Sequence, residues 1–491
     1  MTEIEHFSDK AQDEERISEE RKNSLDALKN IFIEEQDINF LDLGQHNNTW
    51  YYGIALKGKN NLIVTSERII YRTFVTYIYP DGMDYKEESR RQKVKEDEIS
   101  KKFGLHYKHN LGSIAPFWRK EGAYGFEAFI KEELKPIDKQ QLIQEIINEL
   151  NHFMDFAEDN IYALIEALYI LCSYCYILFD SLGILYINAP RGSGKTKNAK
   201  LLRFIAFRGY DMGASGGMTK AQLSRTLEGN KGLIIIDEYE FMDKESKQLT
   251  DQILNASIER DAYIITSEQV GKTWEPKKFH IFSPKVVCNI TGLNPTTLTR
   301  CIQIKLIKAQ KNSEKGKRRP KEYEFLELRD KLHCFFMQNW KKIKDIYETY
   351  EFSLSNREAD VWKPLCAMSK FFGESYEKEL LAFLEKYQKD KDYGDDYLTT
   401  LLLKIYENSP DIAEWFSSNH ILENFKLSET EYEFKTHTIG RKLTEFKTIP
   451  KRKYSGINQF QLSKKIIKEV LERYYPNLLE KDNENPFSNT P

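Results

Sequence analysis

The residues that most directly indicate chemistry lie near the middle of the chain. A short apolar run ending at Asn188 is followed at once by Ala189-Pro190-Arg191-Gly192-Ser193-Gly194-Lys195-Thr196 and then by a helix-like stretch. Glycines let backbone N–H groups curl around phosphates at a helix N-terminus, a lysine reaches the β and γ phosphates, and a threonine ligates magnesium. The spacing predicts a nucleotide-binding phosphate loop at Gly192, Ser193, Gly194, Lys195 and Thr196. Ala189 stands where such loops usually begin with glycine.

A second acidic motif follows about forty residues later. Four apolar residues, 233–236, run directly into Asp237 and Glu238. A central strand would deliver Asp237 to magnesium, and Glu238 would polarise a water for attack on the γ phosphate. A buried strand that merely ends in an exposed acidic pair is the alternative, which the nearby phosphate loop disfavours. Together the motifs predict a nucleotide hydrolase that uses ATP and Mg²⁺, with Thr196 and Asp237 as the metal ligands.

Two further polar residues follow at strand boundaries. The segment between the two motifs is long enough for one extra strand and helix, as in ATPases that carry an additional strand and a catalytic glutamate. Asn289 ends the next apolar run, where it could orient the attacking water or could simply begin a turn. Arg300 lies just before the last core strand, at the position of an arginine finger aimed at a neighbouring subunit's nucleotide. A surface or structural role for Arg300 stays open.

Two basic regions are candidates for contacting DNA. Residues 262–283 predict a hairpin in which Lys272, Lys277 and Lys278 contact phosphates and Trp274 stacks on a base, although a plain surface hairpin fits equally well. The final block reads as three helices and a hairpin around a Ser455-Gly456 turn, the order of a winged helix. Residues 435–465 hold nine Lys or Arg and one acid. The expected duplex contacts are Arg441, Lys442, Lys451, Arg452 and Lys453.

The elements that must position these residues suggest an α/β protein of several parts. Short apolar strands alternate with helices over 182–306, which predicts a mostly parallel sheet. The expected segments are a disordered acidic tail 1–24, an α+β N-terminal domain 25–124, a helical collar 125–180, an ATPase core 181–308, a basic linker 309–322, a helical lid 323–393, a winged helix 394–478 and a disordered tail 479–491.

Composition limits the alternatives. The 491 residues are 40% hydrophobic and 30% charged with a net charge of -3, so the chain folds and carries no uniformly basic coat. Six scattered cysteines do not form a disulfide framework, and Cys172 and Cys175 are expected to be buried thiols without a metal. The first twenty residues have eight acids and no apolar stretch, unlike a secretory signal. Residues 161–179 imitate a membrane span, but Glu166 in their middle favours a buried helix.

The motifs together resemble one family. Residues 160–475, with the phosphate loop, the run SRTLEGNKGLIIIDEYEFM, the run LNPTTLTRCIQI and the helix beginning at Arg357, resemble AAA+ ATPases of plasmids, prophages and chromosomal cassettes, relatives of MCM-like replicative helicases. The resemblance implies an AAA+ P-loop core and makes Arg357 the second sensor arginine. Ala189 and residues 1–120 depart from the pattern.

These observations lead to one expected function and one alternative from another class. The expected protein is a cytoplasmic, ATP-dependent DNA helicase, a homohexameric ring that holds single-stranded DNA in its channel and duplex at the winged helix, and that replicates a mobile element. The alternative is an ATP-switched DNA-binding initiator or defence regulator that assembles on DNA without unwinding it. A primase fused to a helicase is weakly supported, because residues 25–120 show no paired-carboxylate metal motif.

Overall fold

A computed structural model describes residues 40–56, 60–72, 99, 102–103, 105, 117–156, 161–189, 192–212, 226–227, 230–237, 244–270, 273–289, 293–306, 314–352, 356–392, 396–427, 434–446 and 448–474. The chain forms two compact units, Met1–Leu380 and Leu381–Pro491. The expected N-terminal domain, collar, ATPase core and most of the lid therefore share one unit. The expected acidic tail and the C-terminal tail lie outside the described residues.

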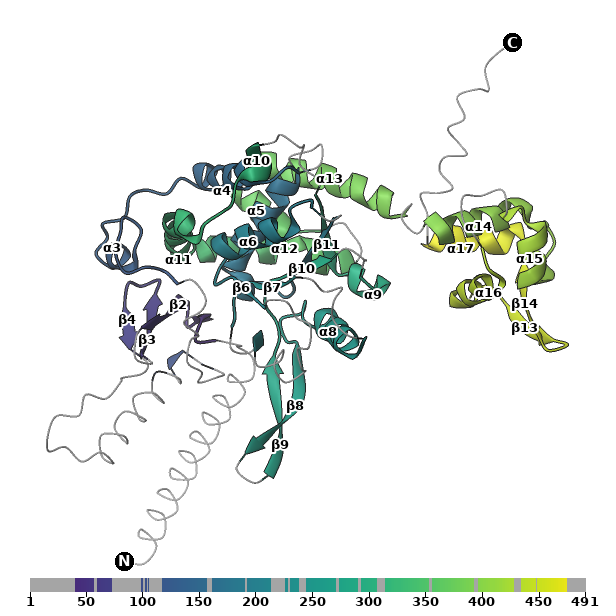
Figure 1. Cartoon of the computed structure of the whole chain (residues 1–491), viewed down its shortest axis with the longest axis horizontal. Coiled ribbons are helices and arrows are strands. Elements are labelled where there is room, and N and C mark those ends of the chain that lie inside the picture. Colours follow the sequence, from purple (N-terminus) through teal and green to yellow (C-terminus); the bar gives the residue numbers. More distant parts are fainter. Residues whose placement is uncertain are drawn as a thin grey trace, which may run out of the picture. The chain divides into compact units, whose positions relative to one another are not determined.

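A five-stranded parallel sheet is the centre of the first unit (Figure 1). Its strands are β5 (Ile184–Asn188), β6 (Tyr210–Asp211), β7 (Ile234–Ile236), β10 (Lys285–Asn289) and β11 (Cys301–Lys305), in the spatial order β11-β5-β10-β7-β6. Each neighbouring pair is parallel. The central strands are buried along almost their whole length, which explains why they read as continuous apolar runs instead of alternating ones.

Helices cover this sheet, and one of them is wholly buried. The phosphate loop leads into α6 (Lys195–Ile205), while α8 (Lys244–Ala256) and the short α9 (Pro295–Leu298) follow later in the chain. All thirteen residues of α5 (Ile161–Ser173) are buried. A helix that is apolar all round belongs in a protein core or a membrane. Among the described residues no helix combines the length and apolarity needed to cross a bilayer.

Other helices of the first unit precede or follow the sheet in sequence. Before it come α3 (Phe126–Ile130) and α4 (Lys139–Phe153), with the 3-10 turn η1 (Tyr176–Leu178) after α5. After it come α10 (Glu314–Lys317), the 3-10 turn η3 (Glu322–Phe325), α11 (Leu326–Thr349), α12 (Asn356–Phe372) and α13 (Glu374–Asp392). Gly373 separates α12 from α13. The boundary between the two units falls inside α13.

The N-terminal sheet is antiparallel and packs by means of its aromatic residues. It consists of β1 (Leu43–His46), β2 (Thr49–Leu56), β3 (Asn60–Thr65) and β4 (Ile70–Arg72). β2 and β3 pair as an antiparallel hairpin. Tyr52 on β2 contacts Phe207 and His333 and donates a 2.7 Å hydrogen bond to the Tyr174 carbonyl. These contacts join the N-terminal sheet to the core.

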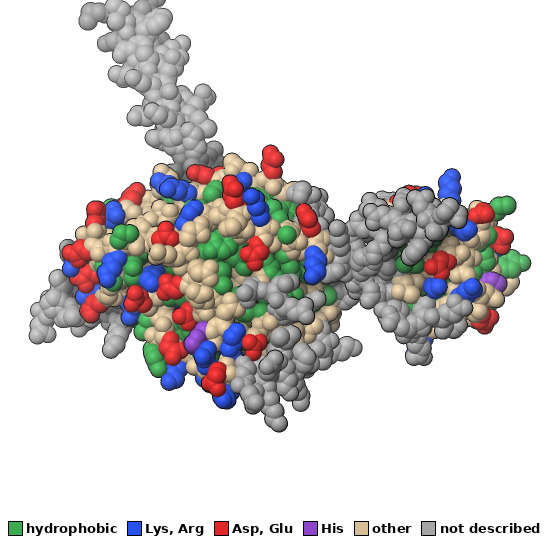
Figure 2. Space-filling model, turned by 90° about the horizontal axis from the view of Figure 1, so that it is seen from above, with side chains coloured by type: hydrophobic (Ala, Val, Ile, Leu, Met, Phe, Trp, Pro, Cys, Tyr) green, Lys and Arg blue, Asp and Glu red, His purple; other side chains and the backbone are tan. Residues whose placement is uncertain are grey.

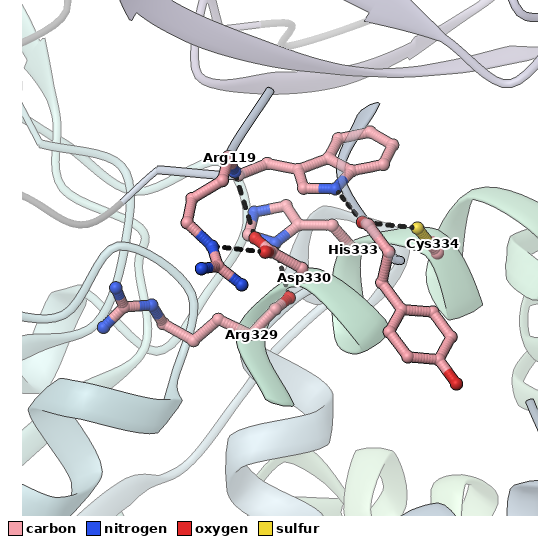
Figure 3. A network of polar contacts seen from close by, with 7 residues as sticks. Arg119, Arg329, Asp330, His333 and Cys334 are labelled. Atoms are coloured by element: carbon pink, nitrogen blue, oxygen red, sulfur yellow. Dashed lines mark hydrogen bonds and ion pairs between the residues drawn. The ribbon is translucent and has the colours of Figure 1, made fainter. Parts of the chain in front are cut away.

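A buried polar network ties residues near Trp118 to α11 (Figure 3). The Arg119 backbone N–H and Nε donate to the two carboxylate oxygens of Asp330 at 3.0 and 2.6 Å. The Trp118 ring stacks on His333, whose Nδ1 is 2.7 Å from the Arg329 carbonyl. Burial lowers the pKa of His333 to about 3, so this imidazole stays neutral among the aromatic rings.

A long antiparallel hairpin extends from the first unit. It is formed by β8 (Tyr263–Val270) and β9 (Thr273–His280), which pair only with each other and project beyond the parallel sheet (Figure 1). This is the hairpin expected over residues 262–283. Tyr263 and Ile265 on its first strand are about half exposed, at 47% and 52%.

The second unit has its own core. Its elements are α14 (Asp396–Asn408), β12 (Glu414–Ser417), α15 (Ser418–Asn424), α16 (Thr436–Glu445), β13 (Lys451–Tyr454), β14 (Ile457–Leu462) and α17 (Lys464–Tyr474). The sheet order is β12-β14-β13. Ser455 and Gly456 both have positive φ, as a two-residue hairpin turn requires. The turn is therefore where the sequence predicted it.

Buried thiols and one buried carboxyl complete the core of the first unit. All six cysteines of the chain are free and buried, including the Cys172 and Cys175 pair. Glu166, in the middle of α5, accepts a hydrogen bond from Nδ2 of Asn198 on α6. Burial raises the pKa of Glu166 to about 8, although the Asn198 contact acts in the opposite direction. The folded state therefore holds this proton more tightly than the unfolded chain does.

This proton makes stability depend on pH. Because the folded pKa is the higher one, the free energy of unfolding falls as pH rises from about 4.5 to about 8, by on the order of a few kcal/mol. Glu166→Gln keeps the shape and removes the charge. We expect its melting temperature to exceed that of the wild type at about pH 9 and to lose this advantage near pH 5. Glu121→Gln, at an exposed position, is the control and should follow the wild type at both values.

Candidate nucleotide site

The phosphate loop has the backbone geometry expected of an anion cradle. Gly192 and Gly194 have φ of +79° and +93°, a conformation that residues with a side chain rarely adopt. A Cβ on Gly194 would also lie 3.2 Å from the Cε of Met154. The next residue, Lys195, begins α6, so the loop leads directly into the positive end of the helix dipole. Pro190 and Arg191 lie outside the described residues.

Residues of this loop line a pocket of about 370 Å³. Gly192, Ser193, Gly194 and Thr196 line one side of it. Ser193 is buried and Thr196 is exposed. The Lys195 ammonium donates to the carbonyl of Ala189, back across the loop. The pocket offers backbone N–H groups, a hydroxyl and lysines, which is the donor set that a polyphosphate requires.

The strand order brings other predicted residues to the same sheet edge. In a parallel sheet all carboxyl ends lie at one edge, and the phosphate loop, Asn289 and Asp237 follow or end β5, β10 and β7 there. Asn289 is fully buried and is in register with Asn188, whereas Asp237 is half-buried. Glu238 lies outside the described residues.

The electrostatics of Cys288 indicate that these side chains converge. This thiol is on β10, between the other two strands. Burial raises its pKa, the charge of Asp237 raises it further, and the charge of Lys195 lowers it. The charges of both motifs thus act on one buried thiol, although the motifs are more than forty residues apart in sequence. A threonine and an aspartate at this edge have the hard oxygen ligands that Mg²⁺ prefers.

Arg300 lies where the strands of the sheet begin, at the opposite end of the strands from the phosphate loop. It immediately precedes β11, and its carbonyl accepts a 3.0 Å hydrogen bond from the N–H of Ile184 at the start of β5. The phosphate loop begins beyond the other end of that five-residue strand, roughly 13 Å or more away at ~3.3 Å per residue. Arg300 therefore does not belong to the pocket of its own chain.

Arg357 lies at the same end of the strands as Arg300, away from the phosphate loop. It is the second residue of α12, and the start of that helix is held at the same edge by a 2.7 Å bond from the Ser181 hydroxyl to the Asp360 carbonyl. Burial lowers the pKa of Arg300 and the charge of Arg357 lowers it further, with Glu259 opposing. In the part of the chain that the structure describes, neither guanidinium forms an ion pair. Two arginines thus converge far from their own nucleotide site.

Part of the segment expected to be a basic linker lies against the pocket. Residues 314–321 are folded against α4 and the phosphate loop, and Gly316, Arg319 and Pro320 line the pocket. Met154 and Asp155, after the end of α4, line it as well. The segment is held by hydrogen bonds to backbone carbonyls and by one ion pair, not by an apolar face, which is why periodicity in the sequence gave no sign of it. Residues 307–313 lie outside the described residues.

Five of the six predicted DNA-contacting side chains that the structure describes are exposed. Lys278 on β9 is exposed, with its ammonium 4.8 Å from the centre of the Tyr263 ring, whereas Lys272 and the side chains of Lys277 and Trp274 lie outside the description. In the second unit Arg441, Lys451, Arg452 and Lys453 are exposed and Lys442 is half-buried. The Arg452 guanidinium lies 4.3 Å from the Trp415 ring centre, and its Nε donates to Gln459 at 2.9 Å.

Comparisons with known proteins add little to this site. No family model and no curated protein matches the chain. Among solved structures it is similar to the NrS-1 C-terminal region (13% identity, 84% of this chain and 96% of that one, TM-score 0.30). It is also similar to two structures of JCV helicase, each at 13% identity and TM-score 0.19, covering 50% of this chain and 69% or 68% of theirs.

Proposed function

We propose that the protein is an ATP-hydrolysing DNA helicase of the AAA+ P-loop class that works as a hexameric ring. The observation that carries the proposal is the spatial order of the parallel sheet. β10 lies between the phosphate-loop strand β5 and the acidic strand β7, so Lys195, Asn289 and Asp237 come to one edge. An inserted strand of this kind separates ATPases with a catalytic glutamate from kinase-type folds. The motifs and this strand order support the same class independently.

The roles of the residues follow from their positions. The N–H groups of the loop and the Lys195 ammonium would bind the triphosphate, and Thr196 with Asp237 would hold Mg²⁺. When bound, Mg²⁺ neutralises charge that develops on the phosphate oxygens. Glu238, next to Asp237 in sequence, would accept a proton from the attacking water, and Asn289 would orient that water.

Different losses are expected in two variants of this site. Lys195→Ala removes a contact to the ground-state phosphates and should abolish most nucleotide binding, whereas Glu238→Gln should keep binding and reduce turnover by about 10²- to 10⁴-fold. Binding of a fluorescent ATP analogue and phosphate release measure the two effects separately. Equal loss of binding in both variants would contradict the assigned roles.

Arg300 and Arg357 support an assembly in which subunits share sites. Both lie at the sheet edge opposite their own phosphate loop, without ion-pair partners among the described residues. A head-to-tail ring would bring this edge of one subunit to the pocket of the next. There the guanidinium groups could stabilise charge on the transferred phosphate. We therefore assign Arg300 and Arg357 to the neighbouring subunit's reaction.

Sharing can be tested by complementation. Lys195→Ala destroys a pocket but keeps its finger, and Arg300→Ala keeps the pocket but removes the finger, so each variant alone should be inactive. In an equimolar mixture, random assembly pairs an intact pocket with an intact finger at about a quarter of the interfaces. We expect ATPase activity to recover toward that fraction. A mixture that stays inactive would instead make Arg300 a structural residue of its own subunit.

The second unit supports DNA binding. Its three helices and hairpin follow the order of a winged helix, and the basic residues of β13 are exposed around a guanidinium fixed by Trp415 and Gln459. In the first unit, by contrast, acidic and basic side chains are interspersed over the face drawn in Figure 2. Arg441 and Lys442 on α16 would approach a groove, with β13 and β14 as the wing. Nine Lys or Arg residues against one acid lie in residues 435–465 of a chain whose net charge is -3.

Reversing the wing charges should remove most duplex affinity. We expect Lys451→Glu, Arg452→Glu and Lys453→Glu together to weaken binding and to reduce the slope of log affinity against log salt by about three, at roughly 0.9 per phosphate contact. ATPase activity without DNA should stay near wild type. The control is Lys341→Glu with Lys342→Glu, exposed positions on α11. If the slope of log affinity against log salt is unchanged in the wing variant, DNA is bound by another part of the protein.

Unwinding itself needs a separate measurement, because an assembly protein could hydrolyse ATP and bind duplex without it. Strand displacement on a forked duplex by the wild type, lost in Glu238→Gln, is the result expected of a helicase. ATPase activity without displacement would favour the ATP-switched initiator or regulator. If the wild type displaces the strand, the same assay with Lys278→Ala tests whether the β8–β9 hairpin contributes to displacement, since Lys278 is exposed on that hairpin.

A further inference from the structure

The segment Glu314–Pro320 is held by contacts with α6 and with the residues at the end of α4. The Lys197 ammonium, on α6, donates to the Lys315 carbonyl at 2.8 Å. The Lys315 ammonium lies 3.4 Å from the Asp155 carboxylate and donates to the Met154 carbonyl at 3.3 Å. The Arg318 guanidinium donates to the His152 carbonyl at 2.9 Å. These contacts hold the segment against the pocket, which Gly316, Arg319 and Pro320 line.

The pocket wall formed by α6 and this segment is rich in positive charge. Lys197, Lys200 and Arg319 line the pocket, and Asp155 is the acid among the described lining residues. Burial lowers the pKa of Lys197, and the charge of Arg319 lowers it further, while Asp155 acts in the opposite direction. The cations therefore repel one another. A multiply charged anion in the pocket would relieve this repulsion, whereas an uncharged ligand would not.

The Arg319 side chain is oriented by its own segment. One terminal nitrogen, Nη1, donates to the Gly316 carbonyl at 2.9 Å and to the Arg318 carbonyl at 3.1 Å. The remaining N–H groups of a guanidinium form a planar fork that matches a phosphate. Arg319 is also the one arginine among the described residues that line the pocket. Arg357, which the family resemblance would place near the nucleotide, lies at the other sheet edge.

We propose that Arg319 is a phosphate-binding residue supplied in cis, and that the segment 314–320 closes over a nucleoside triphosphate bound to the phosphate loop. This inference rests on the proposed nucleotide site and adds a contact that the loop motif does not contain. The ligand class is a nucleoside triphosphate, because the charge of the wall exceeds what the loop lysine alone would supply. A nucleoside monophosphate, with fewer negative charges, should gain less from Arg319.

The test compares Arg319→Ala with Lys317→Ala. Lys317 is in the same segment, but its ammonium pairs with Glu314 in solvent, and it does not line the pocket. Binding of fluorescent ATP and AMP analogues is measured by anisotropy. We expect Arg319→Ala to weaken ATP binding about ten- to hundredfold, as for loss of hydrogen bonds to a charged group, and AMP binding much less. Lys317→Ala should stay within about twofold of wild type.

Closure has its own readout. The segment contains several trypsin sites, and bound ATP should slow cleavage after Lys317 and Arg318 in the wild type but not in Arg319→Ala. Arg319→Lys, which keeps the charge without the fork, should recover part of the affinity and the protection.

The outcomes separate the two proposals. A wild type that does not bind ATP would overturn the nucleotide site and this inference together. If the wild type binds, Lys195→Ala does not, and Arg319→Ala binds ATP as well as Lys317→Ala does, only the inference is overturned. An equal loss of ATP and AMP binding in Arg319→Ala would likewise overturn it, since that pattern reflects a distorted loop.

Discussion

The complete burial of α5 is the constraint on which the first unit depends. The Tyr169 hydroxyl lies 3.0 Å from the Gly183 carbonyl, before β5, and 2.9 Å from the N–H of Lys285, at the start of β10. One phenol thus fixes the starts of two central strands. Glu166, one turn earlier, contacts α6 through Asn198. The positions of Lys195 at the start of α6 and of Asn289 at the end of β10 follow from this single helix.

Tyr174, the residue that follows α5, connects this helix to α6, to α11 and to the N-terminal sheet. The Tyr174 hydroxyl donates to the Ile205 carbonyl at the end of α6, its carbonyl accepts from Tyr52 on β2, and its ring stacks on Phe336 of α11. Asp42, before β1, forms a buried ion pair with Arg208, which follows α6. Removing one partner of such a pair strands a charge in the core. The N-terminal sheet is therefore continuous with the core that carries the phosphate loop.

Much of the candidate site could be predicted because its signals are local. A few neighbouring residues are enough to recognise them: glycines that need positive φ, a lysine at a helix start, and an apolar run that ends in Asp237. The Ser455-Gly456 turn is of the same kind. These features depend on backbone sterics and strand burial, which neighbouring residues specify.

The remaining features depend on contacts between distant segments. Arg357 was correctly expected at a helix start, but the sheet edge it reaches is decided by the contact of Asp360 with Ser181. Arg319 lies in a charged stretch without apolar periodicity, and its position depends on Lys315 meeting Asp155. The neutral state expected for Glu166 likewise comes from surroundings that only the folded chain supplies. No pattern within a short window contains this information.

The burial of every native thiol has a practical consequence for following this protein in motion. All six cysteines are enclosed, and burial raises the pKa of Cys172, Cys175 and Cys288 further from the reactive thiolate form. A maleimide dye should therefore leave the folded wild-type chain almost unlabelled. A single cysteine introduced at exposed Lys453 would then be the dominant attachment point without deletion of any native cysteine. The chain is in this sense already prepared for single-molecule fluorescence.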